Sequence, residues 1–260
     1  MIGYWKGVWK ARHFWMHLAQ SDLRSRWRRS FFGVLWSILQ PLGMTFLLAF
    51  VFSKLFNSNI YTYAPYILSG IIVWECVVAC VTGGALSFVQ ADAYIKQCMH
   101  PLAIYTLRTV LTSLIVLALA SIALLGWSGI VMPENFGWCW LVVLSIFPVL
   151  AAILWPLATV LAYISVRFRD VPHAIGLIMQ AIWFVSPVYF EEKMFRRGGL
   201  DILVDYNPIY HVLQIVRAPL LNGQWPTVAN YFFPMLAAGL FTVLAWLIGR
   251  SVERKVIFFL

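Results

Sequence analysis

The stretch TVLTSLIVLALASIALLGWSGIVMP, residues 109–133, contains no Asp, Glu, Lys or Arg. Residues 135–166 and 218–249 are also free of these four residue types. A helix needs about 20 mostly apolar residues to cross the roughly 30 Å hydrocarbon core of a bilayer. Because lipid offers the backbone no hydrogen-bond partners, helices are the expected form of such runs. The sequence therefore predicts an all-α integral membrane protein.

Apolar runs of this kind occupy most of the chain, which is 62% hydrophobic and only 11% charged. Soluble domains carry about a quarter of charged residues, so this composition excludes an ordinary soluble protein. We expect one membrane domain over residues 31–260, preceded by an amphipathic interfacial helix over residues 1–30. The six predicted transmembrane helices lie near residues 33–53, 66–89, 108–128, 139–165, 172–190 and 231–249.

The basic residues predict the orientation of the chain. With both termini in the cytoplasm, fourteen Lys and Arg residues lie inside and five lie outside, as the positive-inside rule expects. Topology therefore accounts for most of the net charge of +9, and no nucleic-acid partner is needed to explain it. The five outer residues are Lys54, Lys193, Arg196, Arg197 and Arg217.

The N-terminal stretch divides into two faces at 100° per residue. Such a helix lies in the membrane interface, with its apolar face in lipid and its basic face toward headgroups. Two interpretations stay open: a simple topological anchor, or the border of an entrance where Arg24 and Arg28 meet an anionic substrate. The apolar face comprises Trp5, Val8, Trp9, Met16, Ala19, Leu23 and Trp27, and the basic stripe comprises Lys6, Lys10, His13, His17, Arg24 and Arg28.

Residues 191–230, between the last two predicted spans, are long for a connection and unusually apolar. Asn207-Pro208 and Ala218-Pro219 bracket a helical piece of about ten residues, too short to span a bilayer. We therefore expect a pair of re-entrant or interfacial helices on the outer side, where protein or a water-filled cavity covers the backbone.

Glu75 is the only carboxylate well inside an apolar run. Charged groups at such depth usually face a protein interior or an aqueous cavity, so Glu75 is either part of an ion relay or a structural, cavity-facing group.

Cys76 and Cys80 lie one turn apart without further ligands, which favours core residues over a metal site. No catalytic constellation and no phosphate-loop motif is present, so we expect a non-enzyme whose nucleotide energy, if used, comes from another chain.

Several short motifs, taken together and in order, resemble the ABC-2 type permeases of the polysaccharide-export family. Each motif alone is weak, but their order and spacing cover nearly the whole chain. The motifs are residues 22–30 (DLRSRWRRS), 33–37 (GVLWS), 40–42 (QPL), 68–70 (LSG) with Trp74, 167–171 (RFRDV), 186–189 (SPVY), 207–209 (NPI) and 221–224 (LNGQ).

The resemblance implies a six-span subunit of the bacterial inner membrane that forms a homodimer and pairs with two copies of an ABC ATPase. The ATPase would bind ATP and Mg, and this chain would carry no cofactor. Permeases of this family export lipid-linked O-antigen for lipopolysaccharide biosynthesis, capsular polysaccharide or teichoic acid. A dimer also suits the task, because twelve helices around a two-fold axis can enclose a sugar polymer whereas six cannot.

The resemblance also assigns roles to particular residues. The first cytoplasmic loop would carry the helix that couples to the ATPase: Asp92, Ala93, Tyr94, Ile95, Lys96 and Gln97. A second cytoplasmic loop contains Arg167, Arg169 and Asp170. Aromatic side chains suit a glycan conduit because sugar C–H faces stack on rings, although aromatic residues also pack well against lipid and each other. The candidate lining comprises Trp36, Tyr66, Trp74, Glu75, Trp183, Phe184, Tyr189 and Tyr206.

Other functions remain open at this point. An ABC-2 permease could instead export a drug or a lipid, and an ion-coupled secondary transporter could use Glu75. Secondary transporters often contain inverted repeats, and residues 1–130 and 131–260 show no convincing repeat. A membrane scaffold would need neither Glu75 nor the apolar segment 191–230.

Overall fold

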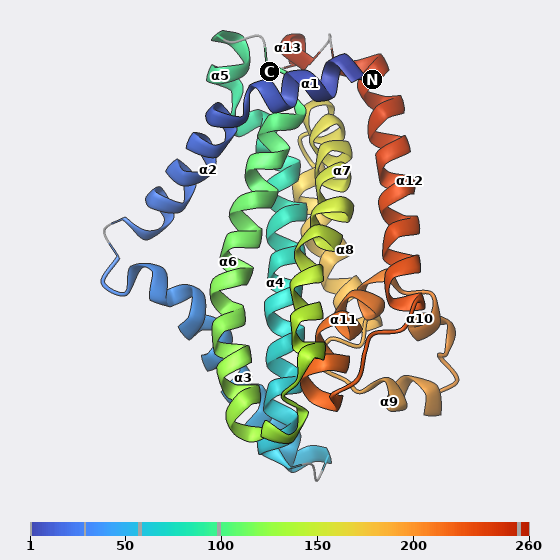
Figure 1. Ribbon diagram of the computed structural model, residues 1–260. Coiled ribbons are helices and arrows are strands. Elements are labelled where there is room, and N and C mark those ends of the chain that lie inside the picture. Colours follow the sequence, from blue (N-terminus) through green and yellow to red (C-terminus); the bar gives the residue numbers. More distant parts are fainter. Residues whose placement is uncertain (1, 29, 57–58, 98–99, 254–255, 260) are drawn as a thin grey trace.

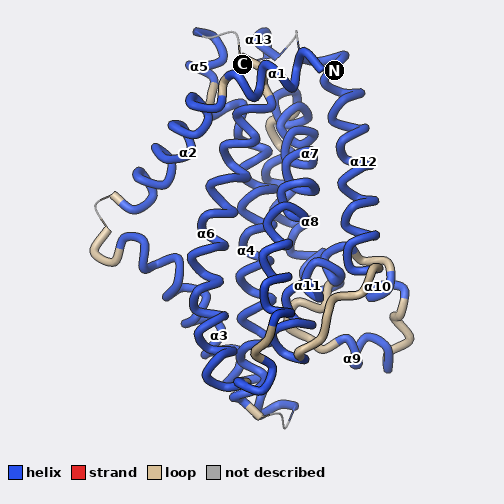
Figure 2. Tube along the Cα trace, viewed as in Figure 1, coloured by secondary structure: helices blue, strands red, loops and turns tan. Residues whose placement is uncertain are grey.

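The computed structural model describes residues 2–28, 30–56, 59–97, 100–253 and 256–259. Its described residues form helices joined by loops, without a strand among them (Figure 2). The α-helices are α1 (Ile2–Lys10), α2 (Arg12–Trp27), α3 (Trp36–Phe56), α4 (Ile60–Gln90), α5 (Asp92–Gln97), α6 (Ala103–Val131), α7 (Ile146–Arg167), α8 (Val171–Val185), α9 (Glu192–Arg197), α10 (Ile202–Asp205), α11 (Pro208–Asn222), α12 (Ala229–Val252) and α13 (Val256–Phe259). Three short 3₁₀ helices are η1 (Gly33–Leu35), η2 (Pro133–Asn135) and η3 (Trp138–Ser145).

Within the described residues, five helical segments are long and apolar enough to cross a membrane: Gly33–Leu55, Ile60–Gln90, Ala103–Val131, Trp138–Arg167 and Ala229–Val252. They match five of the six predicted spans. The sixth, predicted over 172–190, is α8, which has only 15 residues and ends at Val185. Ser186 is extended, with ψ 141°, because it precedes Pro187 and the proline ring disfavours a helical conformation there.

Both termini lie at one end of the bundle, together with α5 and α13 (Figure 1). We call this the α5 end. The opposite end, here the α9 end, holds α9, α10 and α11. The long helices run between the two ends, so the chain crosses the body of the molecule repeatedly.

The central helix is α4, which packs against α3, α6, α7, α8 and α11. Its contact with α7 depends on small residues, as is usual for helices that approach closely in membranes. A Cβ atom added at Gly84 would lie 2.5 Å from the Cβ of Ala158. By contrast, most of α12 is exposed on the outside of the bundle, where it packs against α7 and α11.

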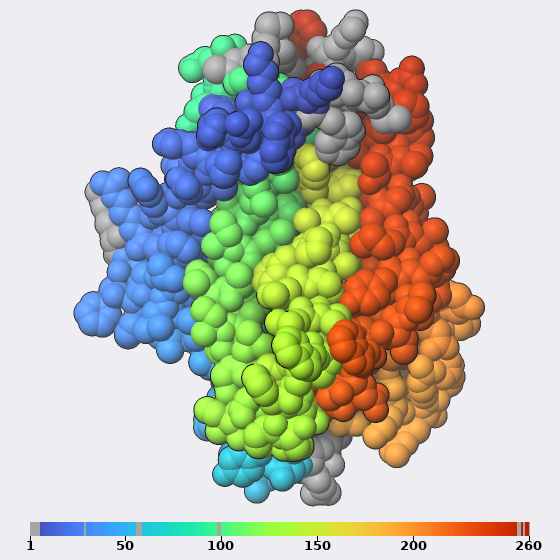
Figure 3. All heavy atoms as spheres, in the orientation of Figure 1, coloured from blue at the N-terminus to red at the C-terminus, as the bar shows by residue number. Residues whose placement is uncertain are grey.

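The N-terminal segment is attached to the bundle only in part. Helix α2 slopes away from the α5 end, and the region around α3 projects from the side of the molecule (Figures 1 and 3). Val8, Ala19 and Leu23 on the predicted apolar face are buried, whereas Trp9 and Met16 are exposed. The predicted apolar face is thus divided between protein contacts and the surrounding medium.

Helix α11 begins where predicted but ends later. The side chain of Asn207 caps it by accepting a hydrogen bond from the backbone N–H of Ile209 at 2.9 Å. The predicted end at Ala218-Pro219 is wrong, because the helix continues to Asn222 and stops at Gly223, which has a φ of 63°. Pro219 removes a single backbone donor near the end of the helix, and Pro219 and Leu220 are both buried.

We predict that Gly84→Ala lowers the stability of the protein by about 1–3 kcal/mol, because the added methyl group overpacks the contact between α4 and α7. Gly126→Ala on α6 is the matched control, since a Cβ there meets nothing within 4 Å. Thermal unfolding of the purified proteins in detergent measures both. Equal melting temperatures for Gly84→Ala and the wild type would contradict the predicted close contact.

Candidate functional site

The exposed basic residues of α2 form the first part of the candidate site. Arg24 and Arg28 are exposed, and they follow the part of α2 that packs on the bundle through Leu18 and Leu23. An ion pair between Asp22 and Arg108, with 2.5 Å between Asp22 Oδ2 and Arg108 Nε, fixes this part of α2 to α6. The arrangement presents fixed positive charge beside the bundle, where an anionic group can bind without displacing protein contacts.

Glu75 lies among polar neighbours that the sequence did not indicate. Gln40 Nε2 donates a hydrogen bond to Glu75 Oε1 at 3.4 Å. Both Glu75 and Arg26, the cation on the last turn of α2, line a cavity of about 40 Å³, together with Ser37 and Ser113. The nearby cation comes from α2, the helix before the first span, and not from a neighbouring span.

The predicted coupling loop folds as α5 at the end that holds both termini (Figure 1). Ile95 is buried, and Asp92 and Lys96 form an ion pair of 2.8 Å along the helix. Ala93, Tyr94 and Gln97 are exposed. Helix α5 is thus anchored by one apolar side and presents its other side outward.

The second predicted cytoplasmic loop, between α7 and α8, is exposed like the outer side of α5. Arg167, Arg169 and Asp170 are all exposed. The Arg167 guanidinium lies 5.7 Å from the ring centre of Phe168.

The candidate lining residues do not form one surface within the chain. Trp74 and Tyr189 are buried in the main core, and Tyr66 and Trp183 are half-buried. Three aromatic side chains are exposed and can contact a substrate without rearrangement: Trp36 at 50%, Phe184 at 68% and Tyr206 at 66%.

The most connected polar side chain near the α9 end is Arg217, which the charge count had placed among the outer-loop residues. It is only 2% exposed. Its Nη1 donates to the carbonyl of Pro187 at 2.8 Å, and its Nη2 to the carbonyls of Val188 at 2.5 Å and Tyr66 at 3.3 Å. Its Nε donates to Ser69 Oγ at 3.1 Å.

The packing around Arg217 explains its position. The guanidinium carbon lies 3.7 Å from the centre of the Tyr66 ring, within the range of a cation–π interaction. Complete burial lowers the pKa of Arg217, yet arginine remains protonated in proteins. Gly70 leaves room for this contact, because a Cβ there would lie 2.3 Å from the Val188 carbonyl oxygen and 2.8 Å from Arg217 Nη2.

Two tyrosines donate hydrogen bonds to the carbonyl groups that follow those bound by Arg217. Tyr63 donates its hydroxyl to the carbonyl of Tyr189 at 2.7 Å, and Tyr66 donates its hydroxyl to the carbonyl of Phe190 at 2.9 Å. With the two carbonyls bound by Arg217, four consecutive carbonyl groups over residues 187–190 accept hydrogen bonds from buried or half-buried side chains. Tyr66 and Tyr189 therefore belong to a structural contact between α4 and the segment after α8.

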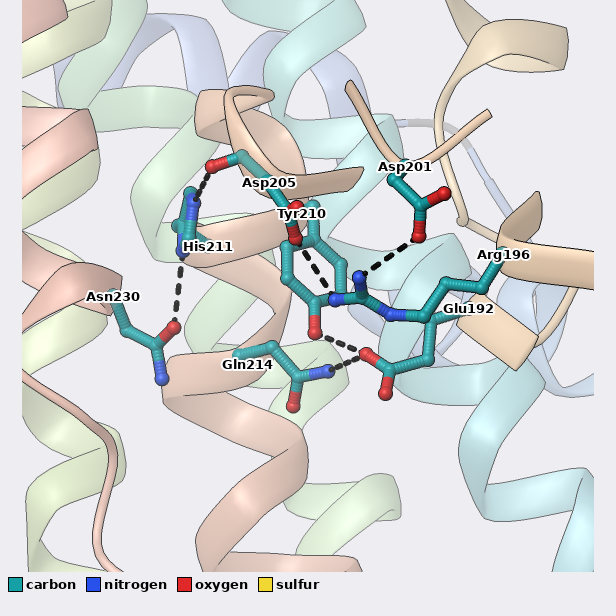
Figure 4. Close-up of polar contacts among 8 residues, drawn as sticks. All are labelled: Glu192, Arg196, Asp201, Asp205, Tyr210, His211, Gln214 and Asn230. Atoms are coloured by element: carbon teal, nitrogen blue, oxygen red, sulfur yellow. Dashed lines mark hydrogen bonds and ion pairs between the residues drawn. The ribbon is translucent and has the colours of Figure 1, made fainter. Parts of the chain in front are cut away.

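A second polar network joins α9, α10, α11 and α12 (Figure 4). Arg196 pairs with Asp201 at 3.3 Å and with Asp205 at 2.9 Å. These bonds connect α9 to α10 and to the residue that precedes it.

Glu192 on α9 accepts hydrogen bonds from Tyr210 and from Gln214, the latter at 3.4 Å (Figure 4). Burial, together with the Glu192 carboxylate, raises the pKa of Tyr210 to about 12, so its phenol keeps its proton and is the donor. His211 contacts the carbonyl of Asp205 at 2.8 Å and Asn230 Oδ1 at 3.1 Å. This network fixes the short helices of the α9 end to the bundle.

We predict that Arg217→Met lowers stability by at least about 3 kcal/mol, because it leaves buried carbonyl groups without donors. Arg217→Lys should rescue only part of the loss, since a lysine ammonium cannot reproduce the planar fork of donors. Thermal unfolding in detergent measures both variants, and Arg197→Gln, an exposed arginine on α9, is the control. Wild-type stability of Arg217→Met would show that the buried contacts contribute nothing.

The amino-acid sequence is similar to known proteins over most of its length. Residues 13–221 match the ABC-2 type transporter family. The O-antigen export system permease protein RfbA of Myxococcus xanthus is 25% identical over 261 residues, which cover 98% of this chain and 97% of the relative. Two Klebsiella pneumoniae proteins of the same name are 22% and 21% identical, covering 82% and 92% of this chain and 81% and 90% of their own lengths. Together with the apolar helices of the bundle, the family match shows that this multi-pass membrane chain belongs to the ABC-2 type transporter family.

Proposed function

We propose that this chain is the transmembrane permease subunit of an ABC exporter that moves a lipid-linked cell-surface polysaccharide, of O-antigen or capsule type, from the cytoplasm across the inner membrane. The observation that carries the proposal is the similarity over 98% of the chain to an O-antigen export permease. In this proposal the exposed basic residues of α2 would contact the substrate, and the exposed side of α5 would contact the partner.

The proposed assembly is a homodimer with two copies of a separate ATPase, which binds ATP and Mg. The docking surface would be α5 and the loop with Arg167, Arg169 and Asp170, with both termini in the cytoplasm. In this arrangement α8 is the sixth membrane-crossing element, and α11 is the re-entrant helix. Closure of the ATPase dimer would move α5 and open a path along the two-fold axis.

The substrate would meet the permease at the basic residues of α2. Arg24 and Arg28 would bind the phosphate groups that link the glycan to its lipid, because guanidinium groups form strong, charge-assisted bonds with phosphate. Trp36, Phe184 and Tyr206 would then offer ring faces to the sugar units. These stacking contacts can pass from one sugar unit to the next as the polymer moves.

Ala93→Arg tests the proposed ATPase contact. Ala93 is exposed on α5, so the substitution should leave the fold unchanged while it places a bulky charge in the docking surface. Affinity purification from the host, followed by mass spectrometry, should recover a partner with a phosphate-loop ATPase motif for the wild type and lose it for Ala93→Arg. Gln224→Arg, exposed at the other end, should retain the partner. A wild-type chain that is recovered without any ATPase would refute the proposed assembly.

Charge reversal tests the proposed substrate contact. The double variant Arg24→Glu and Arg28→Glu should abolish surface glycan, because it replaces phosphate attraction by repulsion, while the amount of protein in the membrane stays unchanged. Lys193→Glu with Arg197→Glu reverses the same number of charges at the α9 end and should export normally. Immunoblots of surface glycan and of the membrane fraction measure both quantities. Normal glycan in the α2 variant would overturn this role.

The cavity that holds Glu75 gives one specific reason to test the ion-coupled alternative. Under the ABC proposal, Glu75→Gln should still export, because the amide can replace the carboxylate as the acceptor for Gln40. Loss of export by Glu75→Gln with the ATPase still bound would favour an ion-coupled step. A transport assay with lipid or drug substrates in the absence of glycan would separate the remaining ABC-2 alternative.

A further inference from the structure

A cavity of about 270 Å³ lies between α7 and α12, in the half of the molecule nearer the α5 end. Its walls are mostly apolar and include Trp155, Ala245 and Trp246. The cavity is smaller than a typical pocket for a whole ligand, which occupies about 300–1,000 Å³, so it has room for only part of a longer molecule.

The position of the cavity indicates which part of a membrane would surround it. Both walls belong to helices that are long and apolar enough to cross a membrane. The cavity reaches Ala103, the first residue of α6, and the last turns of α12. It therefore lies where headgroups of one leaflet meet the acyl chains, the depth at which Trp side chains such as Trp246 are favoured.

Two opposite charges lie together on the lining of this cavity. Arg250 and Glu253 are one turn apart on α12 and its cap, and both line the cavity. Neither is part of an ion pair among the residues that the structure describes. Arg250 lies over the Trp246 ring, 4.7 Å from its centre, which fixes its direction.

We propose that this cavity binds a zwitterionic phospholipid with a primary ammonium group, of the phosphatidylethanolamine type. The phosphate would bind Arg250, the ammonium would bind Glu253, and an acyl segment would fill the apolar part beside Ala245. The pairing of charges favours this lipid over an anionic one, which would bring its headgroup beside the Glu253 carboxylate without an ammonium to compensate. The site requires only a membrane-embedded chain and does not depend on the proposed substrate.

Native mass spectrometry of the full-length, delipidated protein, alone and with any ATPase that co-purifies, tests the proposal. The protein is offered equal amounts of phosphatidylethanolamine and phosphatidylglycerol in detergent. We expect the wild type to prefer phosphatidylethanolamine by up to about fivefold, the selectivity that one partly exposed ion pair of about 1 kcal/mol gives. Glu253→Gln should remove this preference without removing lipid binding, and Arg250→Gln should weaken binding of both lipids.

A cavity-filling variant tests the apolar part separately. Ala245→Phe should displace the lipid, whereas Leu244→Phe, on the neighbouring exposed position of α12, should leave binding unchanged. Lys10→Gln, at an exposed lysine of α1, controls for a general loss of positive charge at the same end, and thermal unfolding checks that each variant folds. Equal binding of the two lipids by the wild type, an unchanged preference in Glu253→Gln, or full binding by Ala245→Phe would overturn the proposal. So would a wild-type dimer that binds no lipid, because a second copy would then occupy the cavity.

Discussion

The hydrogen bonding of residues 187–190 is the constraint on which the α9 end depends. Helix α8 has 15 residues and rises about 22 Å, less than the roughly 30 Å hydrocarbon core. If α8 crosses the bilayer as proposed, the irregular chain after Val185 is still at membrane depth, and its carbonyl groups need donors from the protein. Arg217, Tyr63 and Tyr66 supply those donors. A buried arginine is tolerated without a carboxylate partner because it satisfies main-chain dipoles instead.

This constraint separates residues that hold the fold together from residues that are available to bind other molecules. The face of α4 that carries Tyr66 and Gly70 is occupied by the segment after α8, so it is part of the structural core. The residues that are free to meet other molecules are elsewhere: the basic positions of α2, the exposed side of α5, and aromatic rings such as Trp36 and Phe184. Arg196 joins α9 to α10, and Glu192 joins α9 to α11, so the short helices of the α9 end are held against the bundle.

The sequence predicted features that depend on neighbouring residues. Uncharged runs such as 109–133 are long enough to identify a span by themselves, and Asn207-Pro208 marks the start of α11 because capping is local. It did not predict the buried state of Arg217, whose partner Ser69 is 148 residues away. The continuation of α11 through Pro219 also depends on tertiary packing, which outweighs the local effect of proline. For the candidate site, α5 was predicted from a resemblance, whereas the cavity shared by Arg26 and Glu75 arises only when α2 packs against α6, which is itself packed against α4.

The acceptors around Arg217 have a consequence for how this architecture can vary between proteins. Three of its four acceptors are main-chain oxygens, which every amino acid carries, so the identities of the side chains at 187 and 188 matter little to those bonds, whereas Tyr66 also contributes its ring and its hydroxyl. The arginine itself and the glycine opposite it have no such freedom, because one supplies the donors and the other supplies the space. An anchor of this kind constrains a few positions strongly, because they supply the donors, the ring contact and the space, and it tolerates variation in the segment whose main chain it binds.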